Sequence, residues 1–201
     1  MIFSYNKEAV GDVLLAIVDN SGAEAVSFER NGKVAKIYTS DKTVGYNFFE
    51  VSTILDDLEG KGQVFLSEEQ VSKLNQQLVT EGFEGNLVVD NSPKFVVGYV
   101  KECVPHEDSD HLSVTQIEVD NGEKLQIVCG APNIEQGQKV VVAKPGAMMP
   151  NGLIIWPGNL RGVDSFGMVC SARELNLPNA PKVKGIHVLP EDAIVGTAFQ
   201  Y

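Results

Sequence analysis

The first ninety residues alternate short apolar runs with polar turns, the pattern of a small sheet. Residues 2–5, 13–18 and Thr43–Phe49 each have the length and apolar content of a β-strand. Residues 27–38 predict a hairpin, because Asn31-Gly32 near the centre supplies the positive φ angles of a tight turn. The pattern therefore indicates at least five strands in this part of the chain.

A helix is predicted over residues 68–80. Ser67 and Gln70 have the spacing of a capping box at its start, and Gly82 can close its end. The apolar positions of one helix face are Val71, Leu74 and Leu78. Residues 1–90 are thus expected to form an α+β domain, and since no chemical motif occurs there, its predicted role is packing or interaction.

After a boundary rich in Gly, Asn and Pro at residues 84–94, the pattern becomes that of an all-β domain over residues 91–201. Asn121-Gly122 is a second strong hairpin signal, and Gly98 marks a possible bend in a long strand. The expected strands are residues 95–104, 113–120, 123–129, 140–143, 153–156 and 185–189. Short strands joined by such loops predict a small closed barrel or a sandwich, and the pattern alone leaves both open.

Composition narrows the class of protein. No run approaches the roughly 18 apolar residues of a membrane span, and the start of the chain lacks the pattern of a secretory signal. Three widely spaced cysteines indicate reduced thiols, so we expect a cytoplasmic protein. The net charge of −11 is uneven: residues 1–90 hold 7 Lys and Arg against 15 Asp and Glu, and residues 91–201 hold 9 against 12. Neither half is the basic domain typical of nucleic-acid binding.

Three segments of the second half carry a resemblance. They read HEDSDHL (residues 106–112), QIVCGAPN (126–133) and LRGVDSFGMVCSAREL (160–175). Together they resemble the tRNA-binding domain near the start of the bacterial phenylalanyl-tRNA synthetase β subunit, which has relatives in methionyl-tRNA synthetase and in free-standing tRNA-binding proteins. The two-domain arrangement resembles the stand-alone bacterial YtpR-like proteins.

The resemblance covers about residues 95–199 and implies an OB-fold, a five-stranded Greek-key barrel, over 91–201. It implies a non-catalytic protein that binds tRNA or other structured RNA in a groove, without metal or cofactor, and a possible homodimer. The expected RNA-binding residues are Arg161, Phe166, Lys144, Asn133, Ser165 and Met168.

These residue types suit RNA for different physical reasons. Arg161 and Lys144 can meet phosphates, and Lys144 ends a strand where an OB-fold groove opens. Phe166 stands where the family commonly has Glu or Gln, and it can stack on an unpaired base or pack into the barrel. Asn133 can contact bases, and Ser165 and Met168 are carried over from the motif.

The loop before the second strand departs from the family pattern. His106 and Asp110 are retained and are expected to shape the loop, because such residues bond their own backbone. Glu107 replaces a common Pro and His111 replaces a common Lys, which makes the loop less attractive to phosphate.

Three alternatives remain beside RNA binding. A metal site is disfavoured, because Cys103 and His106 have no second close pair of ligands. A nucleophilic Cys170 is disfavoured, because the motif around it implies no catalysis and instead predicts a helix opening at Cys170 and Ser171. The main alternative is a protein-interaction module that keeps the barrel but has lost RNA affinity, its acidic first domain selecting a basic partner.

Overall fold

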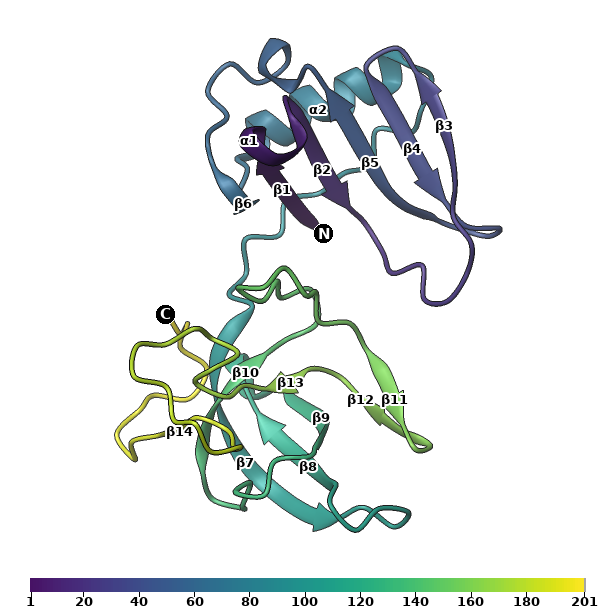
Figure 1. Cartoon of the computed structure of the whole chain (residues 1–201). Coiled ribbons are helices and arrows are strands. Elements are labelled where there is room, and N and C mark those ends of the chain that lie inside the picture. The colour runs from purple at the N-terminus through teal and green to yellow at the C-terminus, as the bar shows by residue number, and fades with distance from the viewer. Residues whose placement is uncertain (201) are drawn as a thin grey trace. The chain divides into compact units, whose positions relative to one another are not determined.

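The computed structural model describes residues 1–200, and they divide into two compact units (Figure 1). Unit 1 is Met1–Asn91, and unit 2 begins at Ser92. Each unit has its own buried apolar cluster.

Unit 1 is an antiparallel sheet of six strands with one main helix. Its elements are β1 (Ile2–Asn6), α1 (Lys7–Val10), β2 (Val13–Ile17), β3 (Ser27–Asn31), β4 (Val34–Tyr38), β5 (Thr43–Phe49), the 3-10 turn η1 (Val51–Thr53), β6 (Lys61–Val64) and α2 (Glu68–Thr80). The strand order is β3-β4-β5-β2-β1-β6, and α2 lies across one face of the sheet (Figure 1). The strands and the hairpin predicted from the sequence are therefore present, and β6 and α1 are additional.

Helix α2 begins and ends where its sequence predicts. Ser67 Oγ accepts the Gln70 N–H at 3.2 Å, and the Gln70 side chain accepts the Ser67 N–H at 2.9 Å, which completes the capping box. Gly82 follows the last turn with a φ of +84°, a left-handed value that glycine adopts without strain. The apolar face of the helix is buried in one cluster with Leu14, Val34 and Phe48 of the sheet.

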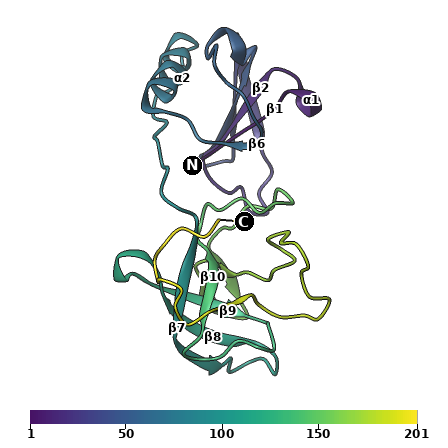
Figure 2. The ribbon, with the colours of Figure 1, turned by 90° about the vertical axis from the view of Figure 1, so that its left-hand side faces the viewer.

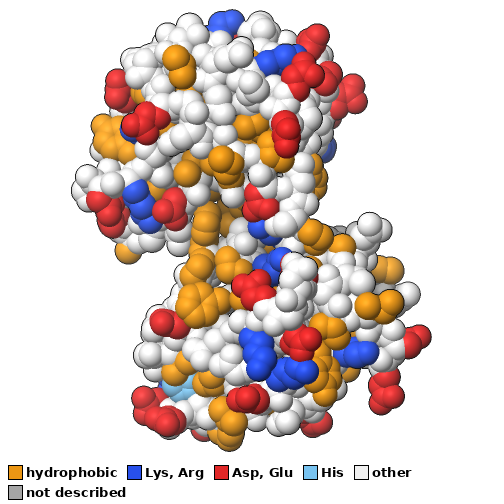
Figure 3. Space-filling view, turned by 180° about the vertical axis from the view of Figure 1, so that it is seen from behind, with side chains coloured by type: hydrophobic (Ala, Val, Ile, Leu, Met, Phe, Trp, Pro, Cys, Tyr) orange, Lys and Arg blue, Asp and Glu red, His pale blue; other side chains and the backbone are white. Residues whose placement is uncertain are grey.

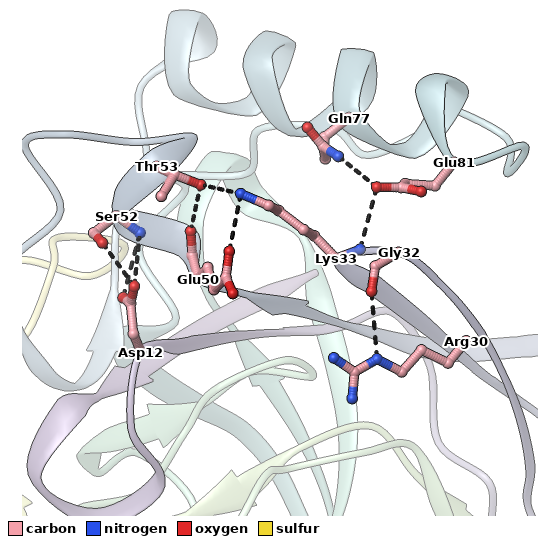
Figure 4. Close-up of polar contacts among 9 residues, drawn as sticks. All are labelled: Asp12, Arg30, Gly32, Lys33, Glu50, Ser52, Thr53, Gln77 and Glu81. Atoms are coloured by element: carbon pink, nitrogen blue, oxygen red, sulfur yellow. Dashed lines mark hydrogen bonds and ion pairs between the residues drawn. The ribbon is translucent and has the colours of Figure 1, made fainter.

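The end of α2 is fastened to the β3–β4 turn (Figure 4). The Glu81 carboxylate accepts the Lys33 N–H at 3.2 Å and the Gln77 amide at 2.8 Å. A Cβ at Gly32 would lie 2.3 Å from that carboxylate, so a larger residue there would displace the Glu81 side chain, and the φ of +49° also favours glycine. The expectation that Asn31 also has a positive φ is wrong, because Asn31 ends β3 and the two turn residues are Gly32 and Lys33.

Asp12 anchors the segment that follows β5. Its carboxylate accepts the Ser52 hydroxyl at 2.7 Å and the Ser52 N–H at 3.3 Å, as drawn in Figure 4, and also the Tyr5 hydroxyl at 3.0 Å. The bond from the Ser52 hydroxyl, helped by those from Tyr5 and the Ser52 backbone, holds the pKa of Asp12 below its ordinary 3.8 although burial opposes the shift. The charged carboxylate is therefore part of the folded structure.

Unit 2 is built on a curled antiparallel sheet with long irregular connections (Figure 2). Its elements are β7 (Phe95–Pro105), β8 (Ser113–Glu118), the turn η2 (Asp120–Gly122), β9 (Lys124–Cys129), β10 (Lys139–Ala143), β11 (Gly158–Leu160), β12 (Val163–Ser165), β13 (Met168–Val169) and β14 (Val188–Leu189). The order is β13-β10-β7-β8-β9, with β14 also on β10 and β11–β12 as a separate hairpin. The predicted turn is confirmed: Asn121 and Gly122 have φ of +58° and +73°.

Strand β7 curls the sheet because its two halves pair with different strands. Residues 95–99 pair with β10, and residues 99–105 pair with β8 across an irregularity between Val100 and Glu102. Gly98 permits the curl, since a Cβ there would lie 2.6 Å from the Val142 side chain and 2.7 Å from that of Ile117. The inner face holds an apolar core that includes Val96, Val100, Ile117, Ile127, Val140 and Val142.

Residues 163–169 bring the two ends of this sheet together. On one side Phe166 N–H donates to the Gln126 carbonyl at 2.8 Å and Ser165 Oγ accepts the Val128 N–H at 3.1 Å, both on β9. On the other side β13 pairs with β10. Gly167 is needed between them, because a Cβ there would lie 2.8 Å from the Ala143 carbonyl oxygen. The result is a nearly closed, barrel-like sheet.

A second apolar cluster lies beside the barrel, and the elements predicted for several of its segments differ from those observed. It includes Val141, Ala143, Ala147, Met149, Ile155, Cys170 and Leu175. Residues 153–156 do not form a full strand: Ile154 makes one isolated antiparallel bridge with Met148, and Ile155 N–H donates to the Ala147 carbonyl. The helix expected from Cys170 is a single turn in which Leu175 N–H donates to the Ser171 carbonyl. Of residues 185–189, only Val188–Leu189 pairs with β10.

We expect Asp12→Asn to lower the free energy of unfolding of unit 1 by about 1 kcal/mol at pH 7, because an amide oxygen accepts less strongly than a carboxylate. The folded pKa of Asp12 lies below its unfolded value, so its contribution is present above the unfolded value and is lost as the pH falls through the folded one. Urea unfolding should therefore show a gap between the two proteins that narrows below about pH 4.

Asp56→Asn is the matched control, because Asp56 is an exposed carboxylate on the segment after β5 that Asp12 anchors. This change should alter the free energy of unfolding by less than about 0.5 kcal/mol. A gap for Asp12→Asn that stayed constant into acid would mean that packing, and not charge, caused the loss.

Candidate nucleic-acid interface

His106 joins two loops at one end of the barrel. It lies in the loop between β7 and β8 and is 4% exposed. Its Nδ1 accepts the Asp108 N–H at 3.0 Å, so we assign the ring proton to Nε2, which donates to the Leu160 carbonyl at 3.2 Å. Because Leu160 ends β11, the imidazole both organises its own loop and holds the β11–β12 hairpin against it.

Arg161 occupies the turn of that hairpin with a positive φ of 49°. Its Nη1 donates to the Asp108 carbonyl at 2.6 Å, which is a second link between the hairpin and the loop. The turn is braced by Asn159, whose side chain accepts the Gly162 N–H at 2.8 Å. The guanidinium is thus exposed and held in place, with a permanent positive charge at the end of the hairpin.

Phe166 opens onto a shallow hollow of about 460 Å³ near the start of β9. Its ring is 41% exposed although its backbone N–H is bonded to β9, so the backbone is fixed while the ring faces solvent. The other lining residues are Lys94, Glu123, Lys124, Leu125, Lys144 and Pro145. An exposed aromatic ring surrounded by ammonium groups is the combination that binds single-stranded nucleic acid.

The three lysines of this hollow differ in their partners. Lys144, whose side chain is 12% exposed, donates to both carboxylate oxygens of Asp120 at 2.8 and 3.0 Å. Lys94 donates to Ser92 Oγ at 3.1 Å, and Lys124 is exposed. A phosphate would therefore meet Lys124 first and would compete with Asp120 for Lys144.

The other expected RNA contacts have partners within the unit. Ser165 is 4% exposed and accepts the Val128 N–H. Asn133 donates to the Ile186 carbonyl at 3.2 Å and accepts the Ile186 N–H at 2.8 Å. Met168 is half-buried against the second apolar cluster. None of these three side chains lines the hollow at Phe166.

The tip of the His106 loop is acidic. Asp110 is exposed, and its carboxylate lies 2.8 Å from His111 Nδ1. This contact with His111 lowers the pKa of Asp110. Glu107 and Asp108 add two further carboxylates to this loop, which makes it unfavourable for phosphate. The nearby positive charge is that of Arg161, which donates to the Asp108 carbonyl.

Two of the three cysteine thiols, those of Cys129 and Cys170, are buried. Burial, with a smaller effect of nearby Glu174, raises the pKa of Cys170 to about 12, and burial also raises the pKa of Cys129. Both are therefore neutral near pH 7 and poor nucleophiles. Among residues 1–200 no group of three His, Cys, Asp or Glu side chains is placed to hold a metal ion. No helix in the same range is both long and apolar enough to cross a bilayer.

Sequence reasoning selected Lys144 and Phe166, which share the hollow, but missed their neighbours Lys94 and Lys124. The signal for Lys124 was available, because it alternates with buried Leu125 after a hairpin turn and so faces outward. Lys94 gave no such signal, because it stands in the boundary before β7. Figure 3 shows Lys and Arg side chains gathered on one face of unit 2, with carboxylates and exposed apolar groups among them.

Comparison with known proteins identifies the class to which this architecture belongs. A family described as "Putative tRNA binding domain" matches residues 95–198, so the chain belongs to the tRNA-binding-domain family. Residues 21–90 match a family described as "Domain of unknown function". Over 199 residues the chain is 51% identical to the Bacillus subtilis protein named "Putative tRNA-binding protein YtpR", with 98% of each chain covered. The chain is thus YtpR-like along nearly its whole length.

The chain is also similar to part of a synthetase subunit. It is 44% identical over 138 residues to the phenylalanine–tRNA ligase β subunit of Chromobacterium violaceum, which covers 67% of the chain and 17% of that subunit. The Oceanobacillus iheyensis subunit is 47% identical over 130 residues, covering 62% and 16%. The chain therefore spans about a sixth of these relatives. A solved structure described as a MetRS related protein from Pyrococcus horikoshii matches 53% of the chain and 88% of its own, at 21% identity and a TM-score of 0.40.

We expect His106→Ala to release the β11–β12 hairpin from the loop, because the Asp108 N–H and the Leu160 carbonyl both lose the imidazole as their hydrogen-bond partner. Backbone amides of residues 107–112 and 158–165 should exchange with deuterium about tenfold faster or more, and those of unit 1 should not change. His111→Ala is the control, since His111 is exposed, and it should leave the exchange in both segments within about twofold. Equal effects of the two variants would contradict the assigned role.

We expect Gly167→Ala to destabilise unit 2 by about 3 kcal/mol, because the new Cβ combines a strained φ of +139° with a clash against the Ala143 carbonyl. Gly162→Ala is the control for strain alone: its φ is +86° but its Cβ would meet open space, and it should cost about 1 kcal/mol. Urea unfolding monitored by circular dichroism measures both. Equal losses would show that the barrel has room at residue 167.

Proposed function

We propose that unit 2 is an OB-fold that binds tRNA. Residues 163–169, which join the two ends of the sheet, supply its fifth strand after β7, β8, β9 and β10. In an OB-fold the nucleic acid lies on the second and third strands, between the loop that joins strands 1 and 2 and the loop that joins strands 4 and 5. The corresponding elements here are β8, β9, the His106 loop and the segment from Lys144 to Phe166. Their arrangement supports the proposal, because the candidate RNA-binding side chains lie on these elements.

The observation that carries the proposal is the exposed Phe166 ring, which shares a hollow with three lysines and lies between β12 and β13, where the backbone closes the barrel. An unpaired base stacks on the ring, while Lys124 and Lys94 meet the adjoining phosphates. Arg161 lies five residues before Phe166 along the chain, at the turn of the β11–β12 hairpin. It meets a phosphate further along the same strand of RNA.

The acidic charge of the chain limits this binding without preventing it. Residues 91–201 are three charges negative and residues 1–90 are eight negative. At physiological salt the screening length is about 8 Å, so a phosphate at Phe166 responds mainly to the charges that line the same hollow, Lys94, Lys124, Lys144 and Glu123. We therefore expect modest affinity with a steep salt dependence and little attraction at long range.

Binding without chemistry agrees with the neutral thiols described above. It also agrees with the names of the relatives: the Bacillus subtilis protein is called tRNA-binding, and the synthetase β subunits contain the same domain as about a sixth of their length. Ser165 supports the interface in this proposal, because it bonds the segment that carries Phe166 to β9. Lys144 contributes to the extent that a phosphate displaces Asp120.

We expect Phe166→Ala to weaken binding of total tRNA by about 5-fold to 100-fold, because base stacking on one aromatic ring contributes roughly 1–3 kcal/mol. Lys124→Ala should reduce the slope of log K against log salt by about one, because one phosphate contact is lost. Asp120→Asn should strengthen binding, since it frees Lys144. Fluorescence anisotropy with labelled tRNA from 25 to 200 mM salt measures all three.

Lys36→Ala removes the same charge from unit 1 and is the matched control, with an expected change of less than about twofold. The proposal fails if wild type and Phe166→Ala bind tRNA equally at low salt. A protein partner that is recovered from lysate after ribonuclease treatment, together with no tRNA affinity in the purified chain, would support the protein-interaction alternative instead.

A further inference from the structure

Unit 2 has a second hollow, whose lining residues are not those of the Phe166 hollow. It measures about 600 Å³, which lies within the range of small-molecule sites. It lies between the end of β9, the turn at residues 171–175 and the loop at residues 181–187. Its apolar lining includes Ala131, Met168, Val169, Ala172, Pro181 and Ile186. Of the residues first expected to contact RNA, Asn133 and Met168 line this hollow and not the one at Phe166.

The walls of this hollow are fixed by hydrogen bonds. Asn133 holds Ile186 through both its backbone N–H and its carbonyl. A Cβ at Gly185 would lie 2.7 Å from the Asn133 side chain, so the loop can approach this closely only with glycine. On the opposite wall the Glu174 carboxylate accepts the Ser171 hydroxyl at 2.7 Å and the Ser171 N–H at 2.8 Å. A cavity held open in this way is preorganised for a ligand.

The rim of the hollow is cationic in an otherwise acidic unit. Residues 168–187 hold Arg173, Lys182 and Lys184 against the single acid Glu174, whereas the remainder of residues 91–201 holds 6 Lys and Arg against 11 Asp and Glu. Arg173 and Lys184 line the hollow and are exposed. Because the Glu174 carboxylate is occupied by two hydrogen bonds from Ser171, an anion is favoured beside Arg173 and Lys184.

We infer that this hollow receives one unpaired nucleotide of the bound RNA, with its base inside and its phosphate at Arg173 and Lys184. The apolar lining suits the flat base, and the edge of the base finds polar partners in Glu174 and His187. His187 is positioned for this, because its backbone is bonded to the Cys170 carbonyl at 2.8 Å and its ring lies edge-on to Phe199. The source of the nucleotide rests on the proposed function; the nucleotide chemistry rests on the hollow itself.

A titration of the full ¹⁵N-labelled chain with adenosine monophosphate, cytidine monophosphate and inorganic phosphate tests the chemistry. The nucleotides should shift backbone amides within residues 169–174 and 184–187, and phosphate alone should bind at least about tenfold more weakly. Lys184→Ala should weaken nucleotide binding about tenfold, because a charge-assisted contact is lost. Lys182→Ala is the matched control: it removes the same charge from the same loop but does not line the hollow, and it should have an effect below twofold.

An RNA hairpin with and without a three-nucleotide single-stranded overhang tests the source. Wild type should bind the overhang form more tightly, and Lys184→Ala should abolish that gain, whereas Phe166→Ala should weaken both forms by the same factor. Nucleotide shifts in the hollow with no affinity for RNA would refute the proposed function and leave the nucleotide site standing. The inference is overturned if the nucleotides shift nothing in the hollow, if phosphate matches them, or if the overhang gains nothing.

Discussion

The barrel of unit 2 depends on one close approach, that of Gly167 to the Ala143 carbonyl. Because glycine has no Cβ, residues 163–169 can bond to β9 through Ser165 and Phe166 and still pair with β10. Without this approach the two ends of the sheet would remain unpaired edges. The same segment orients Phe166 outward and begins the turn that walls the second hollow. Both candidate sites therefore share a single structural origin.

The sequence predicts those elements whose hydrogen bonds are local or repeat with a fixed period. The capping box of α2 and the turn at Asn121-Gly122 are of this kind. The loop at residues 185–187 is not, because Asn133 bonds Ile186 from more than fifty residues away. No periodic signal accompanies such a bond. The expectations at residues 153–156 and at Cys170 failed for another reason, because the local bonds form there but do not continue. Ile154 makes one isolated bridge with Met148, and Leu175 bonds Ser171 in a single turn.

The candidate sites were predictable only to the extent that their residue types are distinctive. Phe166 and Arg161 stand out in a motif, and Lys144 stands out at the end of a predicted strand; the structure places Phe166 and Lys144 around one hollow. Lys94 becomes their neighbour only through folding. Hydrogen bonding also separates residues that composition treats alike: Lys144 is engaged by Asp120, and Lys124 is exposed. A count of lysines therefore describes neither the strength nor the place of the positive potential.

Residue 166 contributes to the barrel through its main chain alone, since the N–H that bonds to β9 is common to every amino acid except proline. A substitution at this position by any residue other than proline therefore keeps the bond that closes the barrel. The side chain displayed beside the lysines can change while the framework that holds it stays constant.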